Sequence, residues 1–167
     1  TNIVPFDIAV PGNHEFDFGT DAFLANLKAS KYPWAAINVT QADGSPVPDL
    51  GGTMMKAIAG LKIALVPAAL DTTNELSSSG DWKFGATVGT AVEAAKKARA
   101  DGADLVIAVV HADHEQDRAL VASHAFDVVM SGHDHDFMTA YDGITAYVET
   151  STDANYLDPL DLAVTIG

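Results

Sequence analysis

The chain has 167 residues, which suits one domain of ordinary size, and 48% of them are hydrophobic, enough to bury a core. This hydrophobic content excludes a disordered chain, and the absence of cysteine excludes disulfides and thiolate metal ligands. Nine Lys and Arg against 23 Asp and Glu give a formal charge of −14. That charge disfavours a nucleic-acid-binding surface, since phosphate backbones require basic side chains, and it suits a protein that binds cations.

Continuous apolar runs predict strands that are covered on both faces, as in parallel sheets. Such runs occupy residues 7–10, 61–67, 104–110 and 126–130. Helical patterns lie between them, at residues 21–31, 90–100 and 115–123. This alternation of strands and helices predicts an α/β fold with layers of helices against a sheet. No apolar run approaches the ~18 residues of a membrane-spanning helix.

The pattern changes after Gly132. Short alternating runs at residues 137–141, 146–149 and 160–166 predict strands of a mixed or antiparallel sheet edge. Residues 42–52 contain Gly and Pro and are expected to form a surface loop. No interior boundary divides the chain, so we expect a single domain over residues 1–167.

The first candidate site follows the run at residues 7–10. Gly12 permits a tight turn, and the side-chain oxygen of Asn13 can bind a divalent cation. His14 and Asp17 are three residues apart, so one helical turn would bring the carboxylate to the imidazole and make His14 a better proton donor. The structural alternative is a helix N-terminus capped by Asn13, with the acidic residues complementing the helix dipole.

Histidines also follow two later strands. His111 ends the run at 104–110, and His133 and His135 follow the run at 126–130, with Gly132 expected to leave room for them. The carboxyl ends of strands in open α/β sheets are where ligands bind, and imidazole is a ligand for Zn, Mn and Fe. The alternatives are a buried histidine bonded to a carbonyl, for His111, and a polar turn, for the other two. His114 lies one turn beyond His111, whereas His124 lies near a helix end.

Taken in order, these motifs resemble those of the calcineurin-like metallophosphoesterases. The run Gly-Asn-His-Glu-Phe-Asp at residues 12–17 is similar to the form found in the 5′-nucleotidase branch, and residues 36–39 resemble the Ala-Asn-Val strand of that branch. The resemblance implies a layered sandwich of mixed β-sheets flanked by helices. It also implies metal-dependent hydrolysis of a nucleotide or another phosphate ester.

The resemblance assigns roles to the matching residues. Asn13, His111 and His133 correspond to ligands of one divalent ion and His135 to a ligand of a second, with Zn, Mn, Mg and Fe not distinguishable. His14 corresponds to the catalytic histidine and Asp17 to its orienting partner. A hydroxide bridging the two ions would attack phosphorus while His14 assists the leaving oxygen.

The chain also departs from the family pattern. The Asp-x-His and Gly-Asp motifs of the first two strands do not occur upstream of Gly12, so we expect the first βαβ unit to be missing. The C-terminal substrate-binding domain is expected to be absent as well, and the chain alone is expected to be weakly active or inactive. A sheet edge exposed in this way predicts pairing with the missing segment or with another chain. By analogy with the family, the location is periplasmic or secreted.

Two other classes of function stay open. One is a non-catalytic metal-binding or interaction module that retains the fold, and the other is a structural α/β domain whose histidines are polar turns. A part of the set found in metallo-β-lactamase-like hydrolases occurs at His111, Asp113 and His114, but the preceding His pair is missing. The remaining acidic residues near the histidines are expected to be solvated loop residues, and they are Asp113, Asp117, Asp134 and Asp136.

Overall fold

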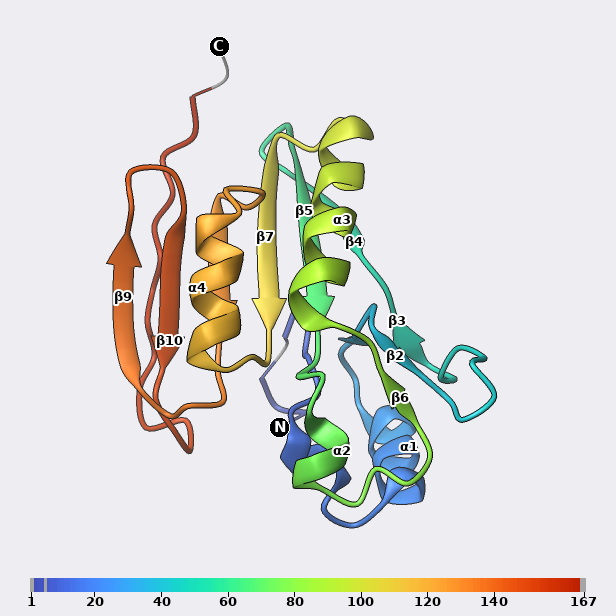
Figure 1. Ribbon diagram of the computed structural model, residues 1–167. Coiled ribbons are helices and arrows are strands. Elements are labelled where there is room, and N and C mark those ends of the chain that lie inside the picture. The colour runs from blue at the N-terminus through green and yellow to red at the C-terminus, as the bar shows by residue number, and fades with distance from the viewer. Residues whose placement is uncertain (1, 5, 166–167) are drawn as a thin grey trace.

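A six-stranded mixed sheet forms the centre of the computed structural model, which describes residues 2–4 and 6–165 (Figure 1). In spatial order its strands are β4 (Met54–Ile58), β5 (Leu61–Ala68), β7 (Leu105–Val110), β8 (Val128–Ser131), β10 (Ala146–Thr150) and β9 (Phe137–Tyr141). The four inner strands run parallel to one another, while β4 and β9 pair antiparallel with their neighbours. The inner strands therefore present their carboxyl ends at one edge of the sheet.

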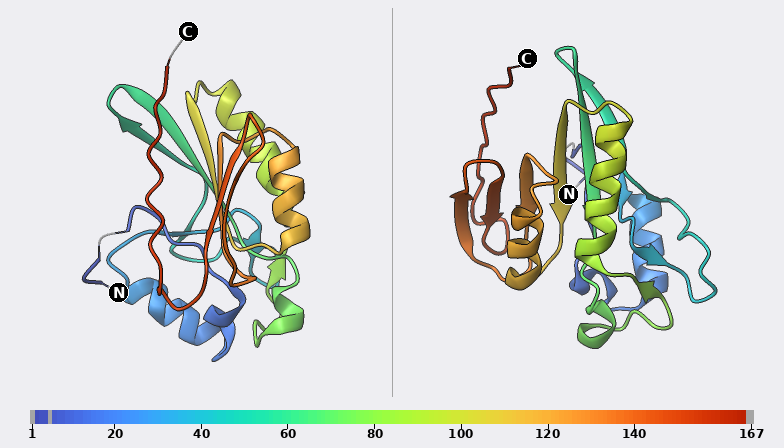
Figure 2. Two further views of the ribbon diagram at one scale, coloured as in Figure 1. Left: turned by 90° about the vertical axis from the view of Figure 1, so that its left-hand side faces the viewer. Right: turned by 45° about the horizontal axis from the view of Figure 1, so that its top comes forward.

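Two long helices, α3 (Thr87–Ala100) and α4 (His114–Ala122), cover one face of this sheet (Figures 1 and 2). The contact is made by small residues of α3, namely Ala91, Ala95 and Ala98, which are buried against alternate residues of β5 and β7. Alanine lets the helix approach the β-branched strands closely, and removal of this apolar area from water stabilises the layer. Phe126 and Leu120 close the same core beneath α4.

A smaller layer lies beside the carboxyl ends of the parallel strands (Figure 1). Its helices are the 3₁₀ helix η1 (Asn13–Phe16), α1 (Thr20–Ala29) and α2 (Thr73–Leu76), and its strands form the pairs β1 (Trp34–Ala35) with β3 (Leu50–Gly51) and β2 (Val39–Thr40) with β6 (Lys83–Phe84). Phe16 is fully buried there against Phe23 and Trp82, at ring-centroid distances of 4.8 and 5.9 Å. This aromatic core holds η1 in place, and η1 carries Asn13 and His14.

The expected layered α/β fold, with mixed sheets flanked by helices, is confirmed. The strands expected at 61–67, 104–110, 126–130, 137–141 and 146–149 are present, as are the helices at 21–31, 90–100 and 115–123, each with small shifts of its ends. Residues 36–39 do not form one strand, because a turn separates β1 from β2. Asn38 in that turn is buried and bonds to the main chain of Ala69 and Gly85.

Two expected strands are wrong. Residues 7–10 contribute only a single bridge, from Ala9 to Trp34, and within the described residues no strand pairs with the rest of the run. Residues 160–165 form no strand, and residue 166 lies outside the described residues. The segment that contains them follows β10 along the side of the sheet away from the helices (Figure 2). The ring of Tyr156 in this segment lies 5.1 Å from that of Phe137, at an angle of 43°. The loop expected at 42–52 is present except for β3 and a bridge at Pro46.

Hydropathy along the helices also bears on membrane insertion. In the described part of the chain, no helix is both long enough and apolar enough to cross a bilayer.

Candidate metal centre

The pairing of β7 with β8 brings His111 and His133 together. The two strands are parallel neighbours, with Val109 opposite Met130, so the residues that follow them leave the sheet side by side. The amide of Ala112 donates to the carbonyl of Gly132 at 3.1 Å, which extends the pairing beyond the strands. As a result the two imidazole rings lie 4.9 Å apart, inclined at 67°.

Asn13 reaches the same place from η1, almost a hundred residues earlier in the chain. Its side chain is buried, and Gly12 precedes it in extended backbone. The reason for glycine here is steric: a Cβ at this position would lie 2.7 Å from Cε1 of His111. The Gly12 amide donates to Glu15 at 2.6 Å, so the turn is closed by its own acidic residue, and burial raises the pKa of Glu15.

Three donor atoms therefore converge from separate segments. Nε2 of His111 lies 2.9 Å from Oδ1 of Asn13 and 3.1 Å from Nδ1 of His133. A neutral imidazole nitrogen either donates or accepts a hydrogen bond. Nε2 of His111 therefore cannot donate to Asn13 and at the same time accept from His133. An amide oxygen and two imidazole nitrogens grouped in this way are a ligand set for a divalent transition metal, and the residues fit such an ion.

The electrostatics favour the ligand form of His111. Burial, with smaller contributions from His133, His14 and His135, lowers the pKa of His111 to about 4. The ring is therefore neutral at neutral pH, which leaves a lone pair available to a metal. All three closely spaced donors are neutral, so the group supplies no charge to compensate a bound cation.

His14 and Asp17 form the contact expected from their spacing. Nδ1 of His14 lies 2.9 Å from Oδ2 of Asp17, and 72% of the His14 side chain is exposed to solvent. The carboxylate on Nδ1 fixes the ring orientation and leaves Nε2 for a substrate. The catalytic role of the pair stays a prediction.

The loop after β8 is strained. His133 and His135 have φ angles of 141° and 64°, in the region that L-residues rarely adopt. Such conformations persist where the surrounding structure enforces them and are frequent at functional sites. A Cβ at Gly132 would meet nothing within 4 Å beyond the two neighbouring residues, so Gly132 is not needed to leave room for His135, and that part of the steric explanation is wrong.

His135 does not join the close group. Its side chain is exposed, and in the described residues the ligand atoms of His111, His133 and His135 do not all lie within 4.8 Å of one another. Its role as a ligand of a second ion stays a prediction. His124 lies elsewhere, paired with Asp142 at 2.9 Å.

One group of residues near the site differs from expectation. Asp117 is not a solvated loop residue, since it lies on α4 and is almost completely buried. Asp113 caps α4 by accepting from the amide of Gln116, and Asp134 and Asp136 both contact His114. Asp117 also lies beside Glu149. No motif of the sequence indicates Glu149, although its spacing from Tyr147 places both residues on one face of β10.

Comparison with known families adds an independent finding. The family model described as calcineurin-like phosphoesterase matches residues 2–137. An apyrase of Tabanus yao is 30% identical over 144 residues, which cover 82% of this chain and 26% of that protein. An NAD 5′-nucleotidase of Haemophilus influenzae is 28% identical over 137 residues, covering 74% of this chain and 21% of its own. The chain thus spans about a quarter of the length of these relatives.

Solved structures agree with the fold. The NAD nucleotidase of Haemophilus influenzae superposes with a TM-score of 0.70 at 27% identity, over 83% of this chain and 28% of that one. A 5′-nucleotidase precursor of Thermus thermophilus has a TM-score of 0.69 at 20% identity, over 82% and 28% of the two chains. The second likeness bears on the fold alone.

Proposed function

The chain belongs to the calcineurin-like phosphoesterase family, and from this premise we propose that it is the metal-binding part of a phosphoester hydrolase of the 5′-nucleotidase type. The observation that supports the proposal most directly is the convergence of Asn13, His111 and His133 from three separate segments. The expected donors are thus adjacent although 98 and 22 residues separate them pairwise along the chain.

In this proposal each residue has one task. Asn13, His111 and His133 hold a divalent ion, and His135 at the exposed rim contributes to a second. A divalent ion bound there polarises a phosphoryl oxygen and lowers the pKa of water. His14, oriented by Asp17, donates a proton to the leaving oxygen as water adds to phosphorus and the P–O ester bond breaks. The exposure of His14 supports this task, since its ring is open to a substrate.

The relatives support a nucleotide substrate. The names apyrase and NAD 5′-nucleotidase both describe proteins that act on nucleotides, and the acidic chain is unsuited to nucleic acid. We therefore propose a nucleotide phosphate ester as substrate, and a periplasmic or secreted location, which the family resemblance supports.

One observation favours a second candidate, a non-catalytic metal-binding module. The close donors Asn13, His111 and His133 are all neutral, and a cation held only by neutral ligands has little charge compensation for its desolvation. This candidate predicts an ion at these residues and no hydrolysis.

The test is phosphate release from a nucleoside 5′-monophosphate with Mn²⁺ in excess. We expect His14→Ala to lower turnover by on the order of 10²–10⁴-fold while leaving the metal content nearly unchanged. His124→Ala removes a histidine remote from the site and is expected to leave turnover unchanged.

Three outcomes would count against parts of the proposal. An equal loss of metal in His14→Ala would reassign His14 as a ligand. Full turnover in His14→Ala would exclude it as the proton donor. Absence of a bound ion at Asn13, His111 and His133 with Mn²⁺ or Zn²⁺ in excess would count against the metal site itself.

A further inference from the structure

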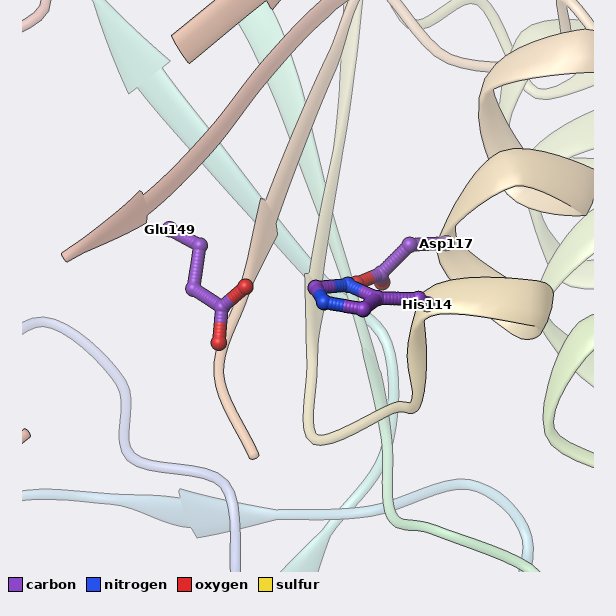
Figure 3. A group of neighbouring side chains, drawn as sticks. All are labelled: His114, Asp117 and Glu149. Atoms are coloured by element: carbon purple, nitrogen blue, oxygen red, sulfur yellow. The ribbon is translucent and has the colours of Figure 1, made fainter. Parts of the chain in front are cut away.

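A second group of ligand-type side chains lies between α4 and β10. His114 and Asp117 are in the first turns of α4, and Glu149 is on β10 with its carboxylate directed towards them (Figure 3). One ligand atom from each of the three lies within 4.8 Å of the others. None of the three belongs to the donor group of Asn13, His111 and His133.

The two carboxylates are buried without sufficient hydrogen bonds. Asp117 is 3% exposed and Glu149 is 1% exposed. Within the described residues, Oδ1 of Asp117 and Oε1 of Glu149 have no hydrogen-bond partner. The Tyr147 hydroxyl lies 2.8 Å from the other oxygen of Asp117 and 3.0 Å from that of Glu149, but it has one proton and can donate to only one of them. Besides the Ser131 hydroxyl, which interacts with Asp117, the two buried carboxylates thus share this one proton.

His114 is also surrounded by carboxylates. Its Nε2 lies 2.9 Å from Oδ2 of Asp136, and its Nδ1 lies 3.2 Å from Oδ2 of Asp134. A neutral imidazole has one N–H, so its second nitrogen faces a carboxylate unless it holds a proton or a metal ion. A histidine that donates one N–H to a carboxylate while its other nitrogen binds a metal is the usual arrangement at metal sites.

We propose that His114, Asp117 and Glu149 bind a divalent transition-metal ion at a second site, separate from the Asn13, His111 and His133 centre. An imidazole and two carboxylates suit Zn²⁺, Mn²⁺ and Fe²⁺. The positive charge of the ion and the negative charges of the two buried carboxylates would compensate each other. The donors of the first centre are neutral and offer their ion no such compensation. An ion here would link α4 to β10. Asp134 and Asp136, which flank His135, contact the His114 ligand of this ion.

The site has a route to solvent. A cavity of about 300 Å³ opens between α4 and the hairpin of β9 and β10, and His114, Asp117 and Tyr147 are among the residues that line it. An ion can therefore reach His114 and Asp117 from solvent in the folded protein, as a metal site requires.

The experiment measures Zn²⁺ binding to the full chain by equilibrium dialysis, in a His111→Ala/His133→Ala background that disables the first centre. We expect this double variant to retain about one Zn²⁺ per chain, and Glu149→Gln added to it to weaken binding by at least about tenfold. Glu115→Gln, an exposed change of the same type in α4, is the matched control and should leave binding unchanged.

A second variant covers the case in which Glu149→Gln does not fold. His114 is partly exposed, so His114→Gln should preserve the fold, checked by circular dichroism, and weaken Zn²⁺ binding to a similar extent. Absence of bound Zn²⁺ in the double variant would overturn the proposal. Equal Zn²⁺ affinity with and without His114→Gln would do so too, because the ion would then lie elsewhere.

Discussion

Gly12 and His111 show how closely single residues are fitted at the first centre. The glycine has an extended backbone that any residue could adopt, but its α-carbon lies against the imidazole ring. The constraint is therefore one of contact and not of backbone conformation. It could not be predicted from the sequence, because the contact joins residues that are almost a hundred positions apart.

This contact leads to the first prediction. Gly12→Ala should displace the His111 ring, since the new Cβ would lie 2.7 Å from it, and weaken Zn²⁺ binding at the first centre by on the order of 10–100-fold. Gly132→Ala is the matched control, because its Cβ meets nothing within 4 Å beyond the two neighbouring residues. Isothermal titration of both variants with Zn²⁺, in a Glu149→Gln background, makes the comparison. Equal affinities would refute the steric role of Gly12.

Asp117 gives a prediction of pH dependence. Burial raises its pKa to about 6 from an ordinary 3.8, so the folded state retains a proton that the unfolded chain has lost. Above pH 6 both states are ionised, and the folded state carries the cost of a buried charge. The unfolding free energy of Asp117→Asn minus that of the unaltered chain should therefore rise by on the order of 2–3 kcal/mol as the pH is raised from about 4 to about 8.

The measurement is urea denaturation at both pH values with a chelator present, so that no ion compensates Asp117. An exposed acid, Glu115→Gln, should show no such change between the two pH values. If the stability difference between Asp117→Asn and the unaltered chain did not vary with pH, the burial of an ionised Asp117 would be excluded.

The sequence predicts these two groups of residues unequally. His111 and His133 follow apolar runs that form adjacent parallel strands, so their grouping could be expected from the parallel arrangement. Asn13 also follows an apolar run, but it reaches the site from η1 and not from a strand end. Asp117 and Glu149 could not be grouped in this way. Their proximity depends on which face of α4 packs on which face of β10, and that follows from tertiary packing.

At the scale of elements, each strand that was predicted correctly pairs along its length with at least one neighbouring strand. β5, β7 and β8 have long apolar runs, and the residues that face the helices are buried while those on the other face are in part exposed. Residues 7–10 have a similar composition but only one bridged residue, Ala9. Apolar composition indicates burial, whereas a strand also requires a neighbour with which its main chain can pair.

The contact of α3 with the sheet gives the next prediction. Ala95 is fully buried on the face of α3 that packs on the sheet. Ala95→Leu should therefore overpack this contact and lower the unfolding free energy by about 1–3 kcal/mol. Ala100→Leu makes the same change at an exposed position of α3 and should have little effect. Thermal denaturation of the two variants tests this, and equal midpoints would contradict the close packing of α3.

At the scale of the whole molecule, the central sheet ends in two edge strands, β4 and β9. All residues of β9 are exposed, including Phe137, Met138 and Tyr141. An exposed apolar edge can pair with another chain. The pairing expected from the sequence concerns an edge left by the first βαβ unit, and it stays a prediction. The partner expected from the sequence is the missing segment or another chain.

Self-association provides the test of this edge. We expect the average mass in sedimentation equilibrium to rise with protein concentration, and Met138→Lys to reduce the rise, since charged residues on edge strands oppose pairing. Lys substitution at Ala100, on an exposed part of α3, serves as the control for added charge. A compact monomer at every concentration would contradict the pairing.

The central claim is that segments from both layers meet to hold a divalent ion, and anomalous diffraction from crystals soaked in Zn²⁺ tests it most directly. The account predicts a zinc peak bounded by Oδ1 of Asn13, Nε2 of His111 and Nδ1 of His133, at metal-ligand distances of about 2.0–2.2 Å. It would be contradicted by a fully soaked crystal in which those three atoms remain within hydrogen-bond distance of one another with no peak between them.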